Sequence, residues 1–156
     1  QIVILPQLVQ DFVAMTGGII ALDRRIVENA DDPAVPAGYV IAAAAARRGT
    51  DPLASVLKAV GLRQTMGLLA TGNLPSDVLA DYARSLTEAD PTFANEDDLI
   101  AAFAAAQIPT TPFAFARDGS DAQAVKLIEN DTFAERDEPE ILSDANWVRL
   151  QGICNI

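Results

Sequence analysis

Apolar residues recur at helical spacing along most of the chain, and this periodicity predicts a mainly α-helical fold. The most apolar stretch is Gly38–Leu69, which we expect to form successive helices with little surface suited to water. Within it, Val40–Arg48 has high helix propensity, and Thr50-Asp51-Pro52 is typical of a helix start. Five consecutive alanines, Ala42–Ala46, would let another backbone approach closely, because no long side chain holds it away.

The N-terminal residues follow a different pattern. Ile2–Leu5 is short, apolar and rich in β-branched residues, and Pro6 ends it. We therefore predict a strand that lies at a sheet edge or pairs with another chain. After it, apolar residues at helical spacing predict a helix that Gly17-Gly18 stops, and then a second amphipathic stretch over 19–28. Residues 29–38 are turn formers with two prolines, which predict a loop.

The second half of the chain predicts shorter helices with capping residues at their starts. A helix is expected over 77–86, and Asn95 precedes another whose first turn is acidic, as the helix dipole favours. Two more helices are expected, one over 121–130 and one after Ser143. The last of these carries Trp147, which we interpret as a core residue.

Residues 110–116 alternate phenylalanine with alanine, which predicts a short strand or an extended arm. Phe113 and Phe115 could fill the core or dock the arm into a neighbouring molecule, and the pattern leaves both open. The fold class we predict is mainly α: a compact helical domain spanning 1–156, with one or two short strands or extended arms at Ile2–Leu5 and Phe113–Ala116.

Length and composition support a single globular domain. A chain of 156 residues, half of them apolar, can bury a core without metal or disulfide staples. The longest unbroken apolar run, Tyr39–Ala46, is far shorter than the roughly 18 residues a membrane span needs, so no transmembrane segment is expected. Cys154 is the sole cysteine and cannot form an internal disulfide.

Charge divides the chain into two parts. Residues 1–75 carry six basic and six acidic side chains, whereas residues 76–156 carry five basic and sixteen acidic ones, so the whole net charge of −11 lies in the second part. An acidic chain is repelled by phosphates, so direct nucleic-acid binding is not expected. The charge-neutral, apolar part could be the core beneath an acidic shell, or it could be a surface that meets partner subunits.

Candidate catalytic groups do not form a recognisable constellation. The chain has no histidine, which removes the commonest general base and metal ligand. Lys58 and Lys126 lie outside known motifs, and the glycine spacings match neither nucleotide-binding fingerprint. Glu96-Asp97-Asp98 is explained by a helix start, and Asp118-Gly119-Ser120-Asp121 by a turn and a cap. We therefore predict no catalytic, cofactor-binding or metal-binding residues, and a protein that is not an enzyme. An enzyme that uses paired carboxylates is the remaining alternative, for which the sequence nominates no residue.

The C-terminal stretch Ile141–Ile153, ILSDANWVRLQGI, resembles the tail ends of small structural proteins in tailed-bacteriophage particles. The segment QIPTTPFAFARD, Gln107–Asp118, adds to this similarity. The two stretches together make up about a sixth of the chain. It implies a non-enzymatic subunit of a symmetric assembly at the head or the head–tail region, located in a virion or in the bacterial cytoplasm, and it transfers no catalytic or binding residues.

Two functions follow from these observations. The first is a structural or assembly subunit that forms homo-oligomers or packs against partner subunits, without a cofactor, a membrane or direct nucleic-acid contact. The residues expected at its interface are Ile2, Val3, Ile4, Leu5, Phe113 and Phe115. The alternative is a soluble acidic binding module, such as an inhibitor or immunity-type protein, that recognises a basic partner through residues 76–156 and loses affinity steeply with salt.

Overall fold

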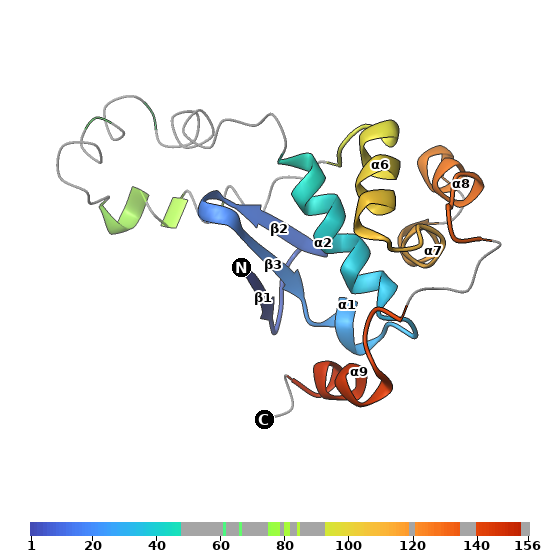
Figure 1. Ribbon diagram of the computed structural model, residues 1–156. Helices are drawn as coiled ribbons and strands as arrows, with labels where there is room; N and C mark the ends of the chain where they lie inside the picture. The colour runs from blue at the N-terminus through green and yellow to red at the C-terminus, as the bar shows by residue number, and fades with distance from the viewer. Residues whose placement is uncertain are drawn as a thin grey trace.

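The computed structural model describes residues 1–47, 61, 66, 75–78, 80–81, 84, 93–118, 121–134 and 140–153 (Figure 1). Helices dominate these residues, but a three-stranded sheet makes the fold mixed α/β rather than purely helical. The elements are β1 (Ile2–Leu5), β2 (Phe12–Met15), the 3-10 turn η1 (Thr16–Gly18), β3 (Ile19–Asp23), α1 (Arg25–Glu28), α2 (Ala34–Ala46), α6 (Glu96–Ala106), α7 (Thr111–Asp118), α8 (Ala122–Glu129) and α9 (Asp144–Gln151).

The sheet has the order β1-β3-β2, with β3 parallel to β1 and antiparallel to β2. β1 confirms the predicted N-terminal strand. The helix predicted after Pro6 is wrong, because β2 and β3 form a hairpin there. Gly17 and Gly18 make its turn with φ of 78° and 83°, values that residues with a side chain rarely adopt. The glycine pair is thus a hairpin turn rather than a helix end.

α2 covers one face of the sheet and contacts β2 and β3 (Figure 1). It starts at Ala34, so the loop predicted over 29–38 is too long, while the helix predicted through the alanines is present. Gly38 lets α2 approach α7 closely, because a Cβ built on it would lie 2.6 Å from the Cβ of Phe113. The close approach that we expected at the alanines therefore also depends on a glycine one turn earlier.

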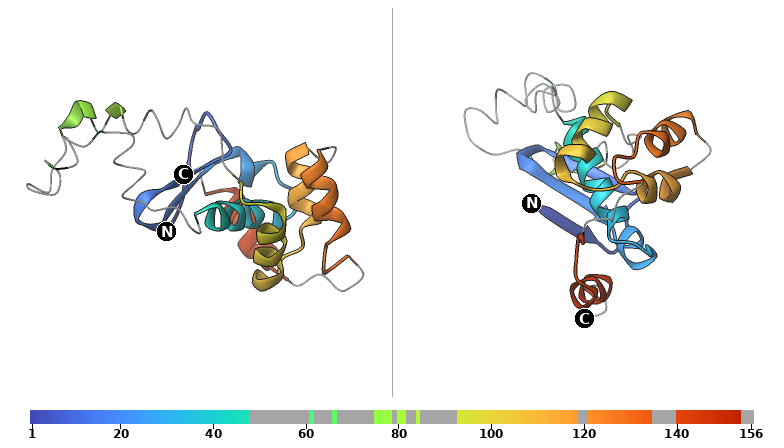
Figure 2. Two further views of the ribbon diagram at one scale, coloured as in Figure 1. Left: turned by 90° about the horizontal axis from the view of Figure 1, so that it is seen from above. Right: turned by 45° about the vertical axis from the view of Figure 1, so that its right-hand side comes forward.

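A second layer of helices, α6 to α8, packs on the side of α2 away from the sheet, as the two further views also show (Figure 2). Two of the predicted caps are present, since Asn95 and Asp121 accept backbone hydrogen bonds from Asp98 and Ala124 at 2.9 and 2.8 Å. Ser143 stands before α9 as expected, but its side chain makes no capping hydrogen bond. The strand or arm predicted over 110–116 is wrong, because α7 is helical. Its first N–H, that of Thr111, donates to the carboxylate of Asp131 at 2.9 Å, a cap supplied from beyond α8.

The core between these layers is aromatic. The ring of Phe113 lies 5.1 Å from that of Tyr39 and 5.3 Å from that of Phe103, centroid to centroid, and all three side chains are fully buried. The guanidinium of Arg117 stacks 3.9 Å from the ring centre of Phe93 and closes one end of this cluster. Burial raises the pKa of Tyr39, and its hydroxyl donates to Asp11 at 3.3 Å.

Several predictions fall on other parts of the chain. Most of the helical stretch expected from Thr50 to Leu69, and Cys154, lie outside the described residues. Only part of the helix expected over 77–86 lies among the described residues.

Candidate assembly surface at the edge of the sheet

β1 is an edge strand, and the hydrogen bonds around it show which of its backbone N–H and C=O groups point toward β3. The N–H of Ile20 donates to the carbonyl of Gln1 at 2.9 Å, and the N–H of Arg24 donates to the carbonyl of Leu5 at 3.0 Å. Backbone groups of a strand point alternately to its two sides, so those of Val3 and Leu5 also point toward β3. The N–H and C=O of Ile2 and Ile4 therefore point away from the sheet, and no described strand pairs with that side.

The side chains of the same two residues open onto an apolar groove of about 530 Å³, and every residue that lines it is apolar. Ile2 and Ile4 form one rim, β3 contributes Leu22, and α2 contributes Pro36 and Val40. The far wall belongs to the C-terminal segment and includes Leu142, Leu150 and Ile153. The groove therefore joins the free edge of β1 to a surface of apolar side chains, as protein interfaces do at their centres.

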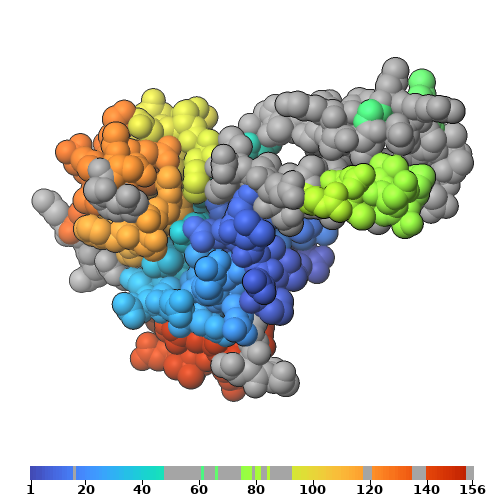
Figure 3. Space-filling view, turned by 180° about the vertical axis from the view of Figure 1, so that it is seen from behind, coloured from blue at the N-terminus to red at the C-terminus, as the bar shows by residue number. Residues whose placement is uncertain are grey.

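α9 forms the outer wall of the groove, and it packs beside α1, below the blue part of the chain when seen from behind (Figure 3). It is held at Gln151, whose side-chain amide donates to the carbonyl of Ala30 at 3.0 Å. None of the side chains of α9 is fully buried. Trp147 is half-buried, so its expected place in the core is wrong, and Val148 is 66% exposed.

A buried carboxylate fixes the chain that leaves β1. Asp23, only 1% exposed, accepts hydrogen bonds from the N–H of Leu8 at 2.7 Å and from the N–H of Arg25 at 2.8 Å. The Nε of Arg25 adds a third bond at 2.7 Å. Burial alone would raise the pKa of Asp23, but these hydrogen bonds outweigh it and lower that pKa. The loop after β1 is thereby tied to the end of β3, which holds the edge strand in place.

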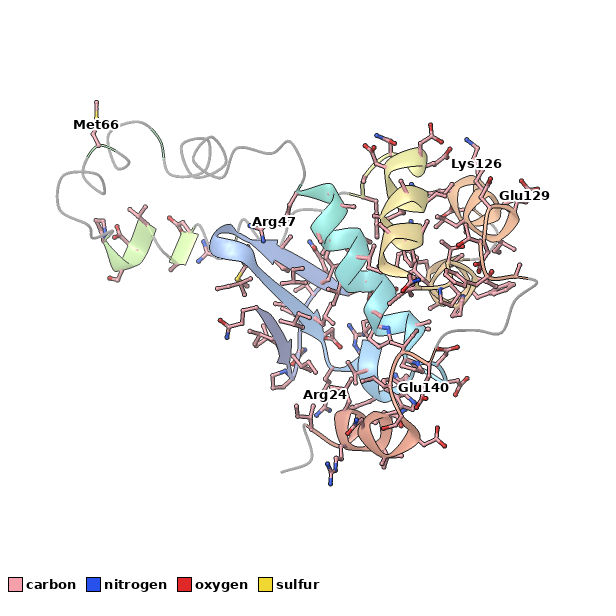
Figure 4. All side chains as sticks on the ribbon, in the orientation of Figure 1. Arg24, Arg47, Met66, Lys126, Glu129 and Glu140 are labelled. Atoms are coloured by element: carbon pink, nitrogen blue, oxygen red, sulfur yellow. The ribbon has the colours of Figure 1, made fainter. Side chains whose placement is uncertain are left out.

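The side chains of the edge carry no charge. Gln1–Gln10 contains no Asp, Glu, Lys or Arg, although the chain as a whole has a net charge of −11. Edge strands in monomeric proteins are commonly protected from pairing with another chain by charged side chains, and β1 has none. Charged residues such as Lys126 and Glu129 project instead from α8, on the opposite side of the molecule (Figure 4). The Lys126 ammonium pairs there with Glu96 of α6.

The six residues expected at an interface occupy three different environments. Ile2 is 55% exposed, and Val3, Ile4 and Leu5 are half-buried, so β1 offers both surface and backbone to a partner. Phe113 is 0% exposed and belongs to the core, where it has no surface to offer. Phe115, 65% exposed, projects from the other side of α7 into a separate cavity of about 440 Å³ beside α1 and α2.

A third cavity, of about 320 Å³, has a different chemistry from the groove. Its walls carry four carboxylates together with the ring of Trp147. One of them, Asp32, is already used in the fold, because it accepts the N–H of Ala34 at 2.7 Å and starts α2. The other three, Asp31, Glu140 and Asp144, are exposed. This arrangement can attract a basic side chain through charge and the aromatic face.

The groove residues beyond β1 were missed by sequence reasoning. Leu22, Val40 and Leu150 are far apart in the chain, and each was interpreted as part of a separate apolar helix face. The signal available was the hairpin: a glycine pair between two short apolar runs, which would have placed Leu22 on a strand.

Other kinds of site gain no support from the described residues. No group of three or more Cys, Asp or Glu side chains in this part of the chain is placed to hold a metal ion. Nor does any of its helices combine the length and apolar character needed to cross a membrane. The sequence matches no protein-family model, no curated protein and no solved structure at a significant level.

Proposed function

We propose that the protein is a non-enzymatic structural or assembly subunit that packs against copies of itself through the free edge of β1. The observation that carries this proposal is the combination of outward backbone groups at Ile2 and Ile4 with an apolar groove beneath them. Unpaired N–H and C=O groups at a strand edge are a template for another strand. The apolar side chains beside them gain free energy when a partner removes them from water.

A second copy is favoured over a basic partner by the distribution of charge. Two copies with a net charge of −11 each repel one another, and contact is least costly where neither carries charge. Gln1–Gln10, whose side chains are all uncharged, provide such a surface, whereas a basic partner would find no acidic side chain there. Association through backbone hydrogen bonds and apolar burial should also persist at high salt, because screening acts on charges.

The proposal extends to the kind of assembly. The stretch Ile141–Ile153, which resembles small structural proteins of tailed-bacteriophage particles, includes the outer wall of the groove. A subunit of a phage-like head or head–tail structure would use an edge strand beside an apolar groove to join its neighbours. Its place would then be the virion, or the bacterial cytoplasm before assembly.

A matched pair of substitutions at Ile2 tests the proposal. Ile2→Ala removes the side chain and keeps the N–H, whereas Ile2→Pro removes the N–H as well, on the side of β1 that does not bond β3. A backbone hydrogen bond contributes about 0.5–1.5 kcal/mol, and each subunit of a symmetric pair would lose one. We expect Ile2→Pro to weaken association roughly 5- to 100-fold relative to Ile2→Ala, measured by sedimentation equilibrium. Equal affinities for the two variants would contradict a role for the free edge.

A second candidate function is an acidic binding module that recognises a basic partner. The acidic cavity with Trp147 favours it. In this case an oligolysine peptide should bind the chain, and its affinity should fall steeply between low and high salt. Replacement of Asp144 by Asn should lower that affinity and leave the oligomeric state unchanged. Peptide binding that ignores both changes would remove this candidate.

A further inference from the structure

The free edge of β1 also restricts how a second copy can join it. Four backbone groups point outward, the N–H and C=O of Ile2 and those of Ile4. The next outward position is occupied by Pro6, which has no N–H to donate. The edge can therefore offer a partner both the N–H and the C=O of Ile2 and Ile4, and only the C=O of Pro6.

Symmetry selects the strand direction. Two identical copies most often associate about a two-fold axis, so that the same surface is used on both. When this axis is perpendicular to the sheet, the two β1 strands run antiparallel and each face of one sheet continues into the same face of the other. Ile2 and Ile4 of both copies then lie on the groove side, and the two grooves meet across the seam.

The hydrogen bonds select the register. In an antiparallel ladder, two opposite residues whose N–H and C=O groups point toward each other exchange two hydrogen bonds. If the axis passes beside Val3, Ile2 faces Ile4 of the second copy and Ile4 faces Ile2, so all four outward groups of each copy are paired. Moving the axis to Ile4 would place Ile2 opposite Pro6 and leave the carbonyl of Ile2 without a donor. Moving it to Ile2 would leave Ile4 opposite none of the residues of β1.

We propose that two copies join through β1 in an antiparallel pair whose two-fold axis passes beside Val3, giving a continuous six-stranded sheet; this rests on the self-association proposed above. The two Val3 residues face each other without exchanging hydrogen bonds, on the side of the sheet opposite the groove. The four isoleucines of the two strands lie together on the groove side and make a common apolar floor.

Disulfide trapping tests the register. In a chain carrying Cys154→Ser, Val3→Cys places two thiols in a pair whose Cα atoms are about 4.5 Å apart, within the range that a disulfide spans. The control is Ile2→Cys in the same background. The two copies of that position are offset by two residues, about 7 Å along the strands, beyond a disulfide's reach. The control site is also more exposed than the half-buried Val3, so exposure alone would favour cross-linking there.

We expect the Val3→Cys chain to form a disulfide-linked dimer roughly tenfold or more faster than the Ile2→Cys chain under the same mild oxidation. The native mass of the Cys154→Ser chain is measured alongside. If this chain forms oligomers but Val3→Cys cross-links no faster than Ile2→Cys, the register is wrong and the proposed function stands. If this chain is a monomer at every concentration, the proposed function itself fails. Thermal unfolding of both variants near that of the Cys154→Ser chain verifies that each is folded.

Discussion

Two apolar regions of this molecule differ in whether side chains of the chain itself fill them. Around Phe113, aromatic rings from three elements fill the space between α2, α6 and α7, and Gly38 allows the closest approach. Beside β1, aliphatic side chains from two strands, α2 and the C-terminal segment leave a groove of about 530 Å³. The first region is completed by the chain itself. The second is also apolar, but it has an open edge whose outward backbone groups pair with no other strand among the described residues, and such groups are a template for another strand.

Phe113 and Phe115 should differ most in what they contribute to the free energy of unfolding. Phe113→Ala opens a cavity in the closed region and should lower the free energy of unfolding by about 3–5 kcal/mol. Phe115→Ala removes a ring that is 65% exposed and should change it by less than about 0.5 kcal/mol. Urea denaturation of both variants measures the difference. Similar losses in the two variants would mean that Phe113 does not lie in the core.

Gly38→Ala probes the closest approach in the closed region. At an ordinary helix position this change would stabilise the protein by up to about 1 kcal/mol. Here the new Cβ would lie 2.6 Å from the Cβ of Phe113, so α2 and α7 must separate. We expect the free energy of unfolding to fall by about 1–3 kcal/mol, again by urea denaturation. A stabilised variant would refute the close packing of these two helices.

Asp23→Asn tests the carboxylate that holds the chain after β1, and should cost about 1–3 kcal/mol at neutral pH. The folded-state pKa of Asp23 is lowered from 3.8, so its stabilising contribution is complete above about pH 4 and disappears as pH falls through the lowered value. The difference between the two proteins should therefore shrink in acid, as followed by urea denaturation at several pH values. Asp31→Asn, which removes an exposed charge, is the control and should show little difference at any pH. A loss for Asp23→Asn that stays constant into acid would count against the charged form as its source.

The smallest effect on folding is expected at the open edge. Ile2 is 55% exposed, so Ile2→Lys should change the free energy of unfolding by less than about 0.5 kcal/mol. A lysine on an edge strand opposes pairing with another strand, so the same variant should lose self-association in sedimentation experiments. A variant that remains fully associated would remove Ile2 from the interface.

Local patterns in the sequence predicted part of this fold. β1 and the caps at Asn95 and Asp121 were found because each depends on a few adjacent residues. α7 was missed because alternation of phenylalanine and alanine is compatible with a strand, and its capping carboxylate, Asp131, comes from beyond the next helix. The hairpin was missed because the apolar residues of β2 and β3 also fit helical spacing.

Of the candidate site, only the strand Ile2–Leu5 could be predicted from the sequence. Ile2–Leu5 showed itself as an apolar strand, but its position at the sheet edge depends on pairing with β3. The groove depends on Leu22, Val40 and Leu150, which the fold alone brings together. Phe113 and Phe115 had the same local signal, and only the helical conformation of α7 directs one inward and the other outward.

Amide hydrogen exchange along β1 measures whether the free edge of this strand pairs with a second copy. The N–H groups of Val3 and Leu5 point toward β3 and should be protected at every protein concentration. Those of Ile2 and Ile4 point to the free edge, so their protection should rise with concentration as copies pair, at low and at high salt alike. If Ile2 and Ile4 exchange rapidly at all concentrations while Val3 and Leu5 remain protected, the edge of β1 is not an assembly surface.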